Sequence, residues 1–255
     1  MLANYHTHTK RCNHAQGEDR EYVENAIEAG IDILGFSDHI PWLFETDYRS
    51  GTRMKASLTE DYISCMEKLK KEYEKDIKIY IGFEAEYVSG IMDKQYEFID
   101  QYPYDYMILG EHFTTSEEKG APYTGFETTK EEDLVLYVDT CIEGMETGRY
   151  RYLAHPDLLN YVGSKEIYYR EYKRLCEYLK SKDSPVEINR LGLFEGRHYP
   201  NDDFFEIARE VGNSCIIGFD AHTPDVLSDL KTYEECVKYA ESFNLPIVET
   251  LPGLD

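Results

Sequence analysis

The stretch LANYHTH, residues 2–8, joins a run of strand-forming residues to two histidines, His6 and His8, that are separated by a single threonine. Successive side chains of a β-strand point to opposite faces, so histidines two positions apart project from the same face. A third histidine, His14, follows closely in the sequence. A lone His-x-His pair often arises by chance, so its interpretation depends on what the rest of the chain places beside it.

Short β-rich segments like this one alternate with amphipathic helical stretches along the whole chain. We predict strands at 2–8, 32–39, 78–87, 104–112, 152–155, 185–189 and 215–222. We predict helices at about 19–29, 58–75, 91–100, 130–147, 165–181, 202–211 and 232–243. Ser57-x-x-Glu60 has the spacing of a capping box for the second helix, and Gly30 and Gly148 are typical helix ends.

Seven strand-then-helix units with short connections predict a parallel sheet, either closed into a barrel or open and doubly wound. An eight-fold barrel needs one more unit, and no helix follows the strand-like segment LPIVET near the C-terminus. We therefore favour an α/β fold with a distorted seven-stranded (β/α)7 barrel. No repeat or linker divides the chain, so we expect one domain over residues 1–255.

The charge balance limits the partners of this protein. Its 255 residues include 27 basic and 50 acidic ones, a net charge of −23. Such a surface disfavours nucleic acid and anionic membranes, because phosphate contacts need Lys and Arg. An anionic substrate would require metal ions or a few placed arginines to reverse the local field. No apolar run approaches the ~20 residues of a membrane span, and the six scattered cysteines suit a reducing cytoplasm.

Metal-binding residue types recur at the ends of the predicted strands. They are His39, Glu84, His112, His155, Asp220 and His222, in addition to His6 and His8. In a β/α barrel the carboxyl ends of the strands converge on one rim, and that rim carries the active site. Residues far apart in the sequence are therefore expected to meet there.

Neutral imidazoles and carboxylates are ligands of divalent metals. With His14 the set has nine members, too many for one ion, so two or three ions bridged by a carboxylate are expected. Each residue alone has an ordinary structural explanation, and AHPD (154–157) could be a turn. A metal centre is nevertheless favoured, because seven of the eight histidines belong to this set and only His198 lies outside it.

These motifs together resemble the PHP (polymerase and histidinol phosphatase) family. The resemblance rests on HTHT (6–9), SDH (37–39), Glu84, EH (111–112), AHPD (154–157) and DAH (220–222), and it extends from Tyr5 to at least His222. Within the family the chain is most similar to the stand-alone histidinol-phosphate phosphatases. The family's fold, a distorted seven-stranded barrel, agrees with the count of units.

The resemblance implies three divalent metal ions, with Zn, Mn or Fe all compatible with the ligands. One ion would be held by His6, His8, Glu84 and Asp220. A second would share Glu84 and add His112 and His155, and a third would take His14, His39 and His222.

The chemistry expected of such a site is the hydrolysis of L-histidinol phosphate in histidine biosynthesis. Clustered cations lower the pKa of a bound water and neutralise charge on the phosphoryl group. We expect a metal-bridging hydroxide to attack phosphorus in line, with Glu84 essential and no covalent phosphoenzyme. The leaving alkoxide needs a proton, from Asp38 or from a metal-bound water. Asp38 could equally be a partner that orients an imidazole.

Substrate contacts are expected from EINRLGLFEGRHYPND (187–202), where Asn189, Arg190 and Arg197 are the candidates. Related phosphatases commonly begin this loop with the same Glu-x-Asn and carry an arginine further on. Here Arg190 directly follows Asn189, where a small residue is expected, so either arginine is open as the phosphate ligand. Two long connections, 40–57 and 113–129, have the length and place of lids. Trp42 in the first either lines a pocket for an organic group or fixes the loop to the barrel.

Three alternatives remain. One is a PHP phosphoesterase for another small-molecule ester or a phosphotyrosyl protein, with a sugar phosphate or a nucleotide as the small-molecule candidates. Another is a hydrolase of the amidohydrolase type, which usually has a metal-bridging lysine where this chain has Glu84. The third is a non-catalytic PHP module, although such modules tend to lose ligands and this chain keeps all nine. The sequence leaves the oligomeric state open.

Overall fold

Parallel strands form the centre of the molecule in the computed structural model, which describes residues 2–251 and 253–254. The two ends of the predicted domain, residues 1 and 255, lie outside the described residues. One sheet has the order β1 (Ala3–Asn4), β2 (Ile33–His39), β3 (Lys78–Ala85) and β4 (Tyr106–Leu109). A second pairs β5 (Val186–Asn189) with β6 (Cys215–Gly218).

Single bridges connect the two sheets. Leu153 bridges Leu109 of β4 on one side and Val186 of β5 on the other, and Thr7 bridges Ala221 just beyond β6. Every one of these pairings is parallel, as are the ladders within the sheets. The result is an α/β fold with a curled parallel sheet, and the prediction of a parallel sheet with intervening helices is confirmed.

The count of seven strands is not confirmed, since the described residues form six. The segment predicted as a strand at 152–155 is reduced to the bridges of Leu153. It cannot extend further, because His155 has a φ of 29° and leaves the extended conformation, with Pro156 directly after it. LPIVET likewise contributes only a single bridge, between Ile247 and Cys215.

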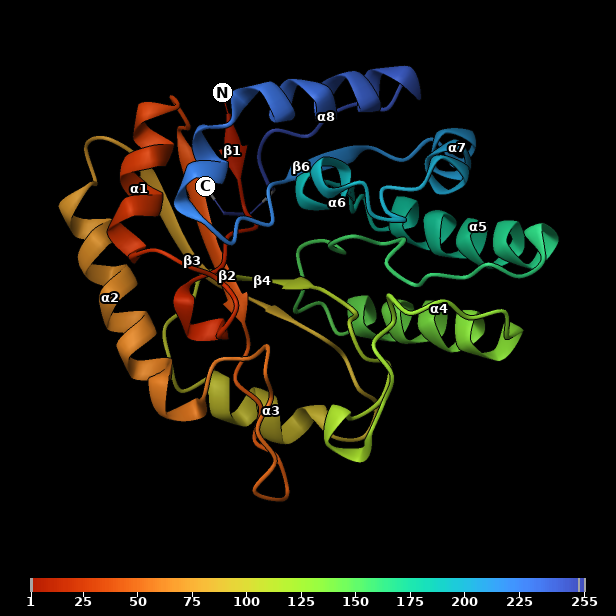
Figure 1. Ribbon diagram of the computed structural model, residues 1–255, viewed down its shortest axis with the longest axis horizontal. Helices are drawn as coiled ribbons and strands as arrows, with labels where there is room; N and C mark the ends of the chain where they lie inside the picture. The colour runs from red at the N-terminus through yellow and green to blue at the C-terminus, as the bar shows by residue number, and fades with distance from the viewer. Residues whose placement is uncertain (1, 252, 255) are drawn as a thin grey trace.

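Helices surround the strands on their outer side, with α1, α2 and α3 along one side of the sheet and α4 and α5 together on another (Figure 1). Seven of them lie where the apolar periodicity predicts: α1 (Asp19–Glu28), α2 (Thr59–Glu72), α3 (Met92–Ile99), α4 (Glu131–Glu146), α5 (Lys165–Ser181), α7 (Asp202–Val211) and α8 (Leu230–Ser242). None of the helices among the described residues is long and apolar enough to cross a membrane.

Local sequence predicted some helix ends correctly and others not. Gly30 and Gly148 adopt positive φ values of 75° and 70° at the ends of α1 and α4, as glycines at helix ends do. The capping box expected at Ser57 is absent, because a 3₁₀ turn (Ala56–Leu58) precedes α2 and no side chain caps that helix. The short helix α6 (Arg190–Glu195) was not predicted, since six residues are too few to show a helical period.

The buried apolar residues form two clusters. In the smaller one, Tyr5, Tyr80, Tyr106 and Tyr152 are buried together with Leu251 from the C-terminal segment. The larger apolar core packs the helices against the outer faces of the strands. At the carboxyl ends the interior becomes polar, and the predicted metal-binding residues lie there.

Candidate metal centre

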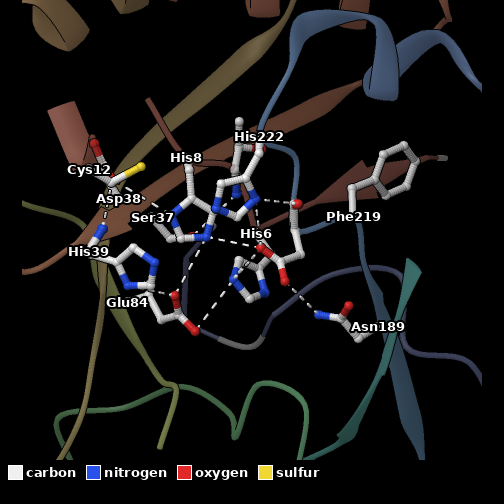
Figure 2. A network of polar contacts seen from close by, with 12 residues as sticks. His6, His8, Cys12, Ser37, Asp38, His39, Glu84, Asn189, Phe219 and His222 are labelled. Atoms are coloured by element: carbon white, nitrogen blue, oxygen red, sulfur yellow. Dashed lines mark hydrogen bonds and ion pairs between the residues drawn. The ribbon is translucent and has the colours of Figure 1, made fainter. Parts of the chain in front are cut away.

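The nine residues singled out by the sequence converge at the carboxyl ends of the strands. His39 ends β2 and Glu84 lies near the end of β3, while His112, His155, Asp220 and His222 follow the subsequent strands or bridges. His6 and His8 follow the two-residue strand β1, and their rings are 5.2 Å apart between centroids. Figure 2 shows side chains from β2, β3 and the N-terminal segment directed toward one another.

Glu84 occupies the centre of this cluster. Its carboxylate oxygens lie 2.9 Å from Nε2 of His155, 3.2 Å from Nδ1 of His39 and 3.5 Å from Nε2 of His8. The Nε2 atoms of His6 and His112 are both 3.6 Å away. One carboxylate therefore faces five imidazoles, which is the position expected of a bridging ligand.

A second carboxylate, Asp220, and two further histidines, His14 and His222, complete the cluster. Asp220 Oδ1 lies 3.1 Å from His8 Nε2 and 3.3 Å from His222 Nδ1. The Nε2 atoms of His14 and His222 are only 2.8 Å apart. Two imidazole nitrogens at this distance repel one another unless a proton or a cation lies between their lone pairs. His14, His39 and His222 present nitrogens within 4.8 Å of one another, as metal ligands must.

Buried carboxylates hold several imidazoles from behind, and the sequence reasoning missed two of them. Glu187 Oε1 is 2.9 Å from His6 Nδ1, and Glu86 Oε1 is 2.9 Å from His112 Nδ1. Such a carboxylate fixes the ring so that the opposite nitrogen is presented to a metal. The spacing Glu84-x-Glu86 was the available signal for Glu86, because residues two apart in extended backbone point to the same face, and Glu86 directly follows β3. For Glu187 the signal was an inward-facing acid on a buried strand.

The electrostatics of the cluster favour added positive charge. Burial disfavours the charged form of His8, but Asp220 and Asp38 outweigh it and raise its pKa to about 9. Burial also disfavours ionised Glu84, yet the surrounding imidazoles hold the pKa of its carboxyl well below the usual range. His222 differs, because burial together with the neighbouring His8 lowers its pKa to about 3 and keeps it neutral. Negative carboxylates and neutral imidazoles in one buried cluster attract a cation.

Unsatisfied atoms in the cluster provide a direct test of whether a metal fits. Within the described part of the chain, Nε2 of His6, Nε2 of His8 and Oε2 of Glu84 are buried without a hydrogen-bond partner. Leaving a buried polar atom unpaired costs roughly 1–3 kcal/mol. All of these atoms are of the types that coordinate divalent cations, and they point into a common space. Bound metal ions would give them the partners that they lack in the protein.

The backbone is adapted to hold these side chains. A Cβ atom on Gly110 would lie 1.9 Å from Oε1 of Glu84, and one on Gly218 would lie 1.8 Å from Oε1 of Glu187. Only glycine leaves room for the two carboxylates at these points. His155 and Asp220 have φ values of 29° and 51°, in the left-handed region that non-glycine residues rarely adopt. Such strain is characteristic of functional sites.

A cavity of about 520 Å³ opens over the cluster. Its floor is formed by seven members of the cluster, and one wall is aromatic, with Tyr123 packed between Phe113 and Phe126. Arg197 also lines the cavity, where it forms an ion pair with Glu195 and donates a hydrogen bond to the Tyr199 hydroxyl at 2.6 Å. Both predicted lid segments contribute, through Thr52 and through residues 113–126.

The structure does not bring three of the predicted residues into this cavity. Arg190 is buried, forms an ion pair with Asp229 and stacks on Phe194. Asn189 caps α6 and donates a hydrogen bond to Asp220 at 3.2 Å, so it orients a cluster member. Asp38 is completely buried, accepts hydrogen bonds from Thr9 and from the backbone of His39, and lies 3.6 Å from Nδ1 of His8.

The position of Asp38 beside Nδ1 of His8 suits its alternative interpretation as an orienting partner of an imidazole, and Asp38 is not among the residues that line the cavity. Trp42 is also buried and packs against Arg53, and it is not among the residues that line this cavity, so its position suits the interpretation that it fixes its loop.

Comparison with known proteins finds relatives of this chain. Residues 4–191 match the model of the PHP domain family. A protein of Deinococcus radiodurans named probable histidinol-phosphatase is 26% identical over 231 residues, 88% of this chain and 87% of the relative. The histidinol-phosphatase of Bacillus subtilis is 35% identical over 115 residues, 42% of each chain.

Among solved structures, the histidinol phosphate phosphatase of Lactococcus lactis, in complex with zinc, L-histidinol and phosphate, has a similar fold. The TM-score is 0.75 at 20% identity, covering 100% of this chain and 98% of that one.

Proposed function

We propose, from the premise that this chain belongs to the PHP domain family, that it is a metal-dependent phosphomonoesterase that hydrolyses L-histidinol phosphate to L-histidinol and phosphate. The observation that carries the proposal is the convergence of seven histidines on Glu84 and Asp220 beneath a cavity that contains an arginine. The names of the Deinococcus and Bacillus relatives support the choice of substrate. We also regard the whole chain as one domain, a distorted barrel whose seventh strand position is occupied by Leu153 alone.

Three metal ions are assigned to the cluster as follows. The first is held by His6, His8, Glu84 and Asp220, the second by Glu84, His112 and His155, and the third by His14, His39 and His222. The third set coincides with one group of mutually close ligand atoms, and the first is supported by the group His6, His8 and Glu84. Zn, Mn or Fe suits these mixed nitrogen and oxygen ligands.

When bound, divalent cations neutralise charge on the phosphoryl group and make an attacking water more acidic. The chain's own residues prepare the site for that chemistry. Glu187 and Glu86 hold the Nδ1 protons of His6 and His112, so that the Nε2 lone pairs face Glu84. The buried floor of the cavity keeps these donors in place before substrate arrives, so little reorganisation is needed during the reaction.

The organic part of the substrate is assigned to the aromatic wall. The Tyr123 ring is stacked with that of His112 at 6.4 Å between centroids, which places the wall directly beside the cluster. Flat apolar rings suit the imidazole ring of histidinol, which can pack against them in an offset or edge-to-face arrangement. The phosphate is assigned to the metal side and to Arg197.

Replacing Arg197 by Ala is expected to raise the KM for the phosphorylated substrate about ten- to a hundredfold. The reason is that a charge-assisted hydrogen bond to phosphate contributes roughly 1.5–3 kcal/mol. Steady-state kinetics of phosphate release measure this change. Arg209→Ala is the matched control, because Arg209 also pairs with a neighbouring glutamate, Glu206, but lies on the exposed surface of α7. Unchanged kinetics in Arg197→Ala would remove this residue from the substrate site.

The substrate assignment is tested by phosphate release from L-histidinol phosphate beside a panel of sugar phosphates, nucleotides, aryl phosphates and phosphodiesters. The protein is first reconstituted with Mn, Zn or Fe. We expect kcat/KM for histidinol phosphate to exceed that of the other esters at least about a hundredfold, which corresponds to roughly 3 kcal/mol of discrimination. Hydrolysis of aryl phosphates without hydrolysis of histidinol phosphate would overturn the substrate and leave the metal chemistry. Bound metal without any turnover would indicate a non-catalytic PHP module.

A further inference from the structure

Arg53, in the long connection between β2 and α2, is one of the most buried charged side chains of the protein, with 3% of its surface exposed. Its guanidinium forms ion pairs with two buried carboxylates, Glu86 and Glu117, the latter at 3.0 Å from Nε. The guanidinium carbon lies 5.0 Å from the centroid of the Trp42 ring and 5.9 Å from that of Phe113. The residue is therefore enclosed on all sides by groups that suit a planar cation.

The partners of Arg53 belong to separate parts of the rim. Trp42 comes from the connection 40–57, Glu117 and Phe113 come from the connection 113–129, and Glu86 follows β3. The backbone carbonyl of Arg53 also accepts a hydrogen bond of 2.9 Å from Asn13, the residue before His14. Both lid segments and the loop of His14 thus meet at one side chain.

The connection to the metal cluster passes through Glu86. Arg53 occupies Oε2 of this carboxylate, and Oε1 lies 2.9 Å from Nδ1 of His112. On the far side of the ring, Nε2 of His112 faces Glu84 at 3.6 Å. The contacts therefore run from Arg53 to Glu86, from Glu86 to His112 and from His112 to Glu84. Phe113, the residue after His112, lines the cavity.

The geometry of the guanidinium explains why an arginine stands here. Two carboxylates buried near one another repel, and each needs hydrogen bonds to stay buried. A guanidinium has several donors in a fixed planar fork, so it can satisfy Glu86 with one edge and Glu117 with another. An ammonium group concentrates its charge at one point on a flexible stem and cannot hold both carboxylates in fixed orientation.

We propose that Arg53 is a positioning residue of the metal centre. By holding Glu86 against Nδ1 of His112, it fixes the direction in which His112 presents Nε2 to the shared Glu84 site. This role rests on the proposed function only in that His112 is taken as a metal ligand. It requires no contact between Arg53 and the substrate, and Arg53 is not among the residues that line the cavity.

The test is a double-mutant cycle on metal affinity, with Arg53→Lys, Glu86→Gln and the combined variant of the full-length protein. Affinity for Co²⁺ is measured by competition with a chelator, and the visible absorption of bound Co²⁺ reports its coordination. Each single variant is expected to weaken binding about ten- to a hundredfold at one of the sites, the range for groups that orient a metal ligand. The combined variant is expected to bind Co²⁺ as tightly as the single variant with the lower affinity, because both substitutions act on the same chain of contacts and their effects do not add.

Two controls separate positioning from general destabilisation. Arg149→Lys alters a similar residue, one that pairs with Asp100 and stacks on Tyr96 beyond the end of α4, and is expected to leave Co²⁺ affinity and spectrum unchanged. Glu117→Gln removes the other partner of Arg53 and is expected to keep Co²⁺ affinity within about threefold of wild type. If Arg53→Lys does not fold, Arg53→Gln combined with Glu117→Gln takes its place, because it removes a buried charge of each sign.

Wild-type Co²⁺ affinity in Arg53→Lys, or effects of Arg53→Lys and Glu86→Gln that add, would overturn the proposal. A wild-type protein that binds Co²⁺ but ignores histidinol phosphate would instead overturn the proposed substrate. The cycle would still be readable in that case, because metal affinity is measured without substrate.

Discussion

Replacing Glu84 by Gln is expected to reduce phosphate release at least about a thousandfold and to lower the metal content of the protein. The carboxylate faces five imidazoles and is the ligand assigned to two ions, so the amide removes a negative charge from both positions at once. The loss of several kcal/mol of charge stabilisation corresponds to a rate effect of this size. Metal analysis of the purified variant and single-turnover phosphate release measure the two effects.

Glu111→Gln is the matched control for this substitution. Glu111 is as deeply buried as Glu84, but burial raises the pKa of its carboxyl well above the usual range, which favours the neutral form, so an amide is expected to replace it with little change. Its Oε2 accepts a hydrogen bond from the backbone of Tyr87, which a glutamine oxygen can also accept. Retention of activity and metal by Glu84→Gln would refute the bridging role.

Removing the metals with a chelator is expected to abolish activity and to lower the melting temperature roughly 5–10 °C near pH 8. A ligand at a hundred times its Kd stabilises the folded state by about 2.7 kcal/mol, and each kcal/mol shifts the melting temperature of a chain of this size by roughly 2–4 °C. Differential scanning calorimetry before and after addition of Zn²⁺ or Mn²⁺ measures the change.

The same experiment has a defined dependence on pH in the metal-free protein. Without metal, protons bind to the imidazoles of His6 and His8, because the nearby carboxylates raise the pKa of His8 to about 9 and that of His6 well above its usual value. The folded state therefore binds protons more tightly than the unfolded state, and this contribution to stability is complete below about pH 6.5 and is lost as pH rises toward 9. The stabilisation by metal should grow over the same interval, since metal and protons compete for the same nitrogens. Equal melting temperatures with and without metal at pH 9 would contradict the assignment.

Much of the fold was predictable because it depends on short-range periodicity. Apolar residues at helical spacing located seven helices, and β-rich segments between them located the strands and their parallel order. The lengths of the strands were less predictable. Residues 152–155 have the composition of a strand but form only the bridges of Leu153, because His155 turns its backbone into the left-handed region to reach Glu84. The strand propensity of this segment is overridden by the contact between His155 and Glu84.

The candidate site divides in the same way. The meeting of the ligand-type residues followed from the sequence, because all of them except His14 lie at or beyond the carboxyl end of a predicted strand, and parallel strands bring those ends together on one rim. Their assignment to particular ions stays a prediction. The roles of Arg190 and Arg197 were not separable in the sequence, since both arginines lie in the same predicted loop, 187–202. The fold directs Arg190 to Asp229 and Arg197 into the cavity.

The sequence by itself determined the parallel α/β architecture and the residue types that gather at its rim, because both depend on periodicity and on the order of strands. Only the tertiary structure decided which groups support them. Glu187 and His6 are 181 positions apart in the sequence, and Arg53 and Glu117 are 64 positions apart. The sequence does not indicate which imidazole or guanidinium a given carboxylate will contact. Such pairings depend on side-chain directions and burial, which exist only once the chain has folded.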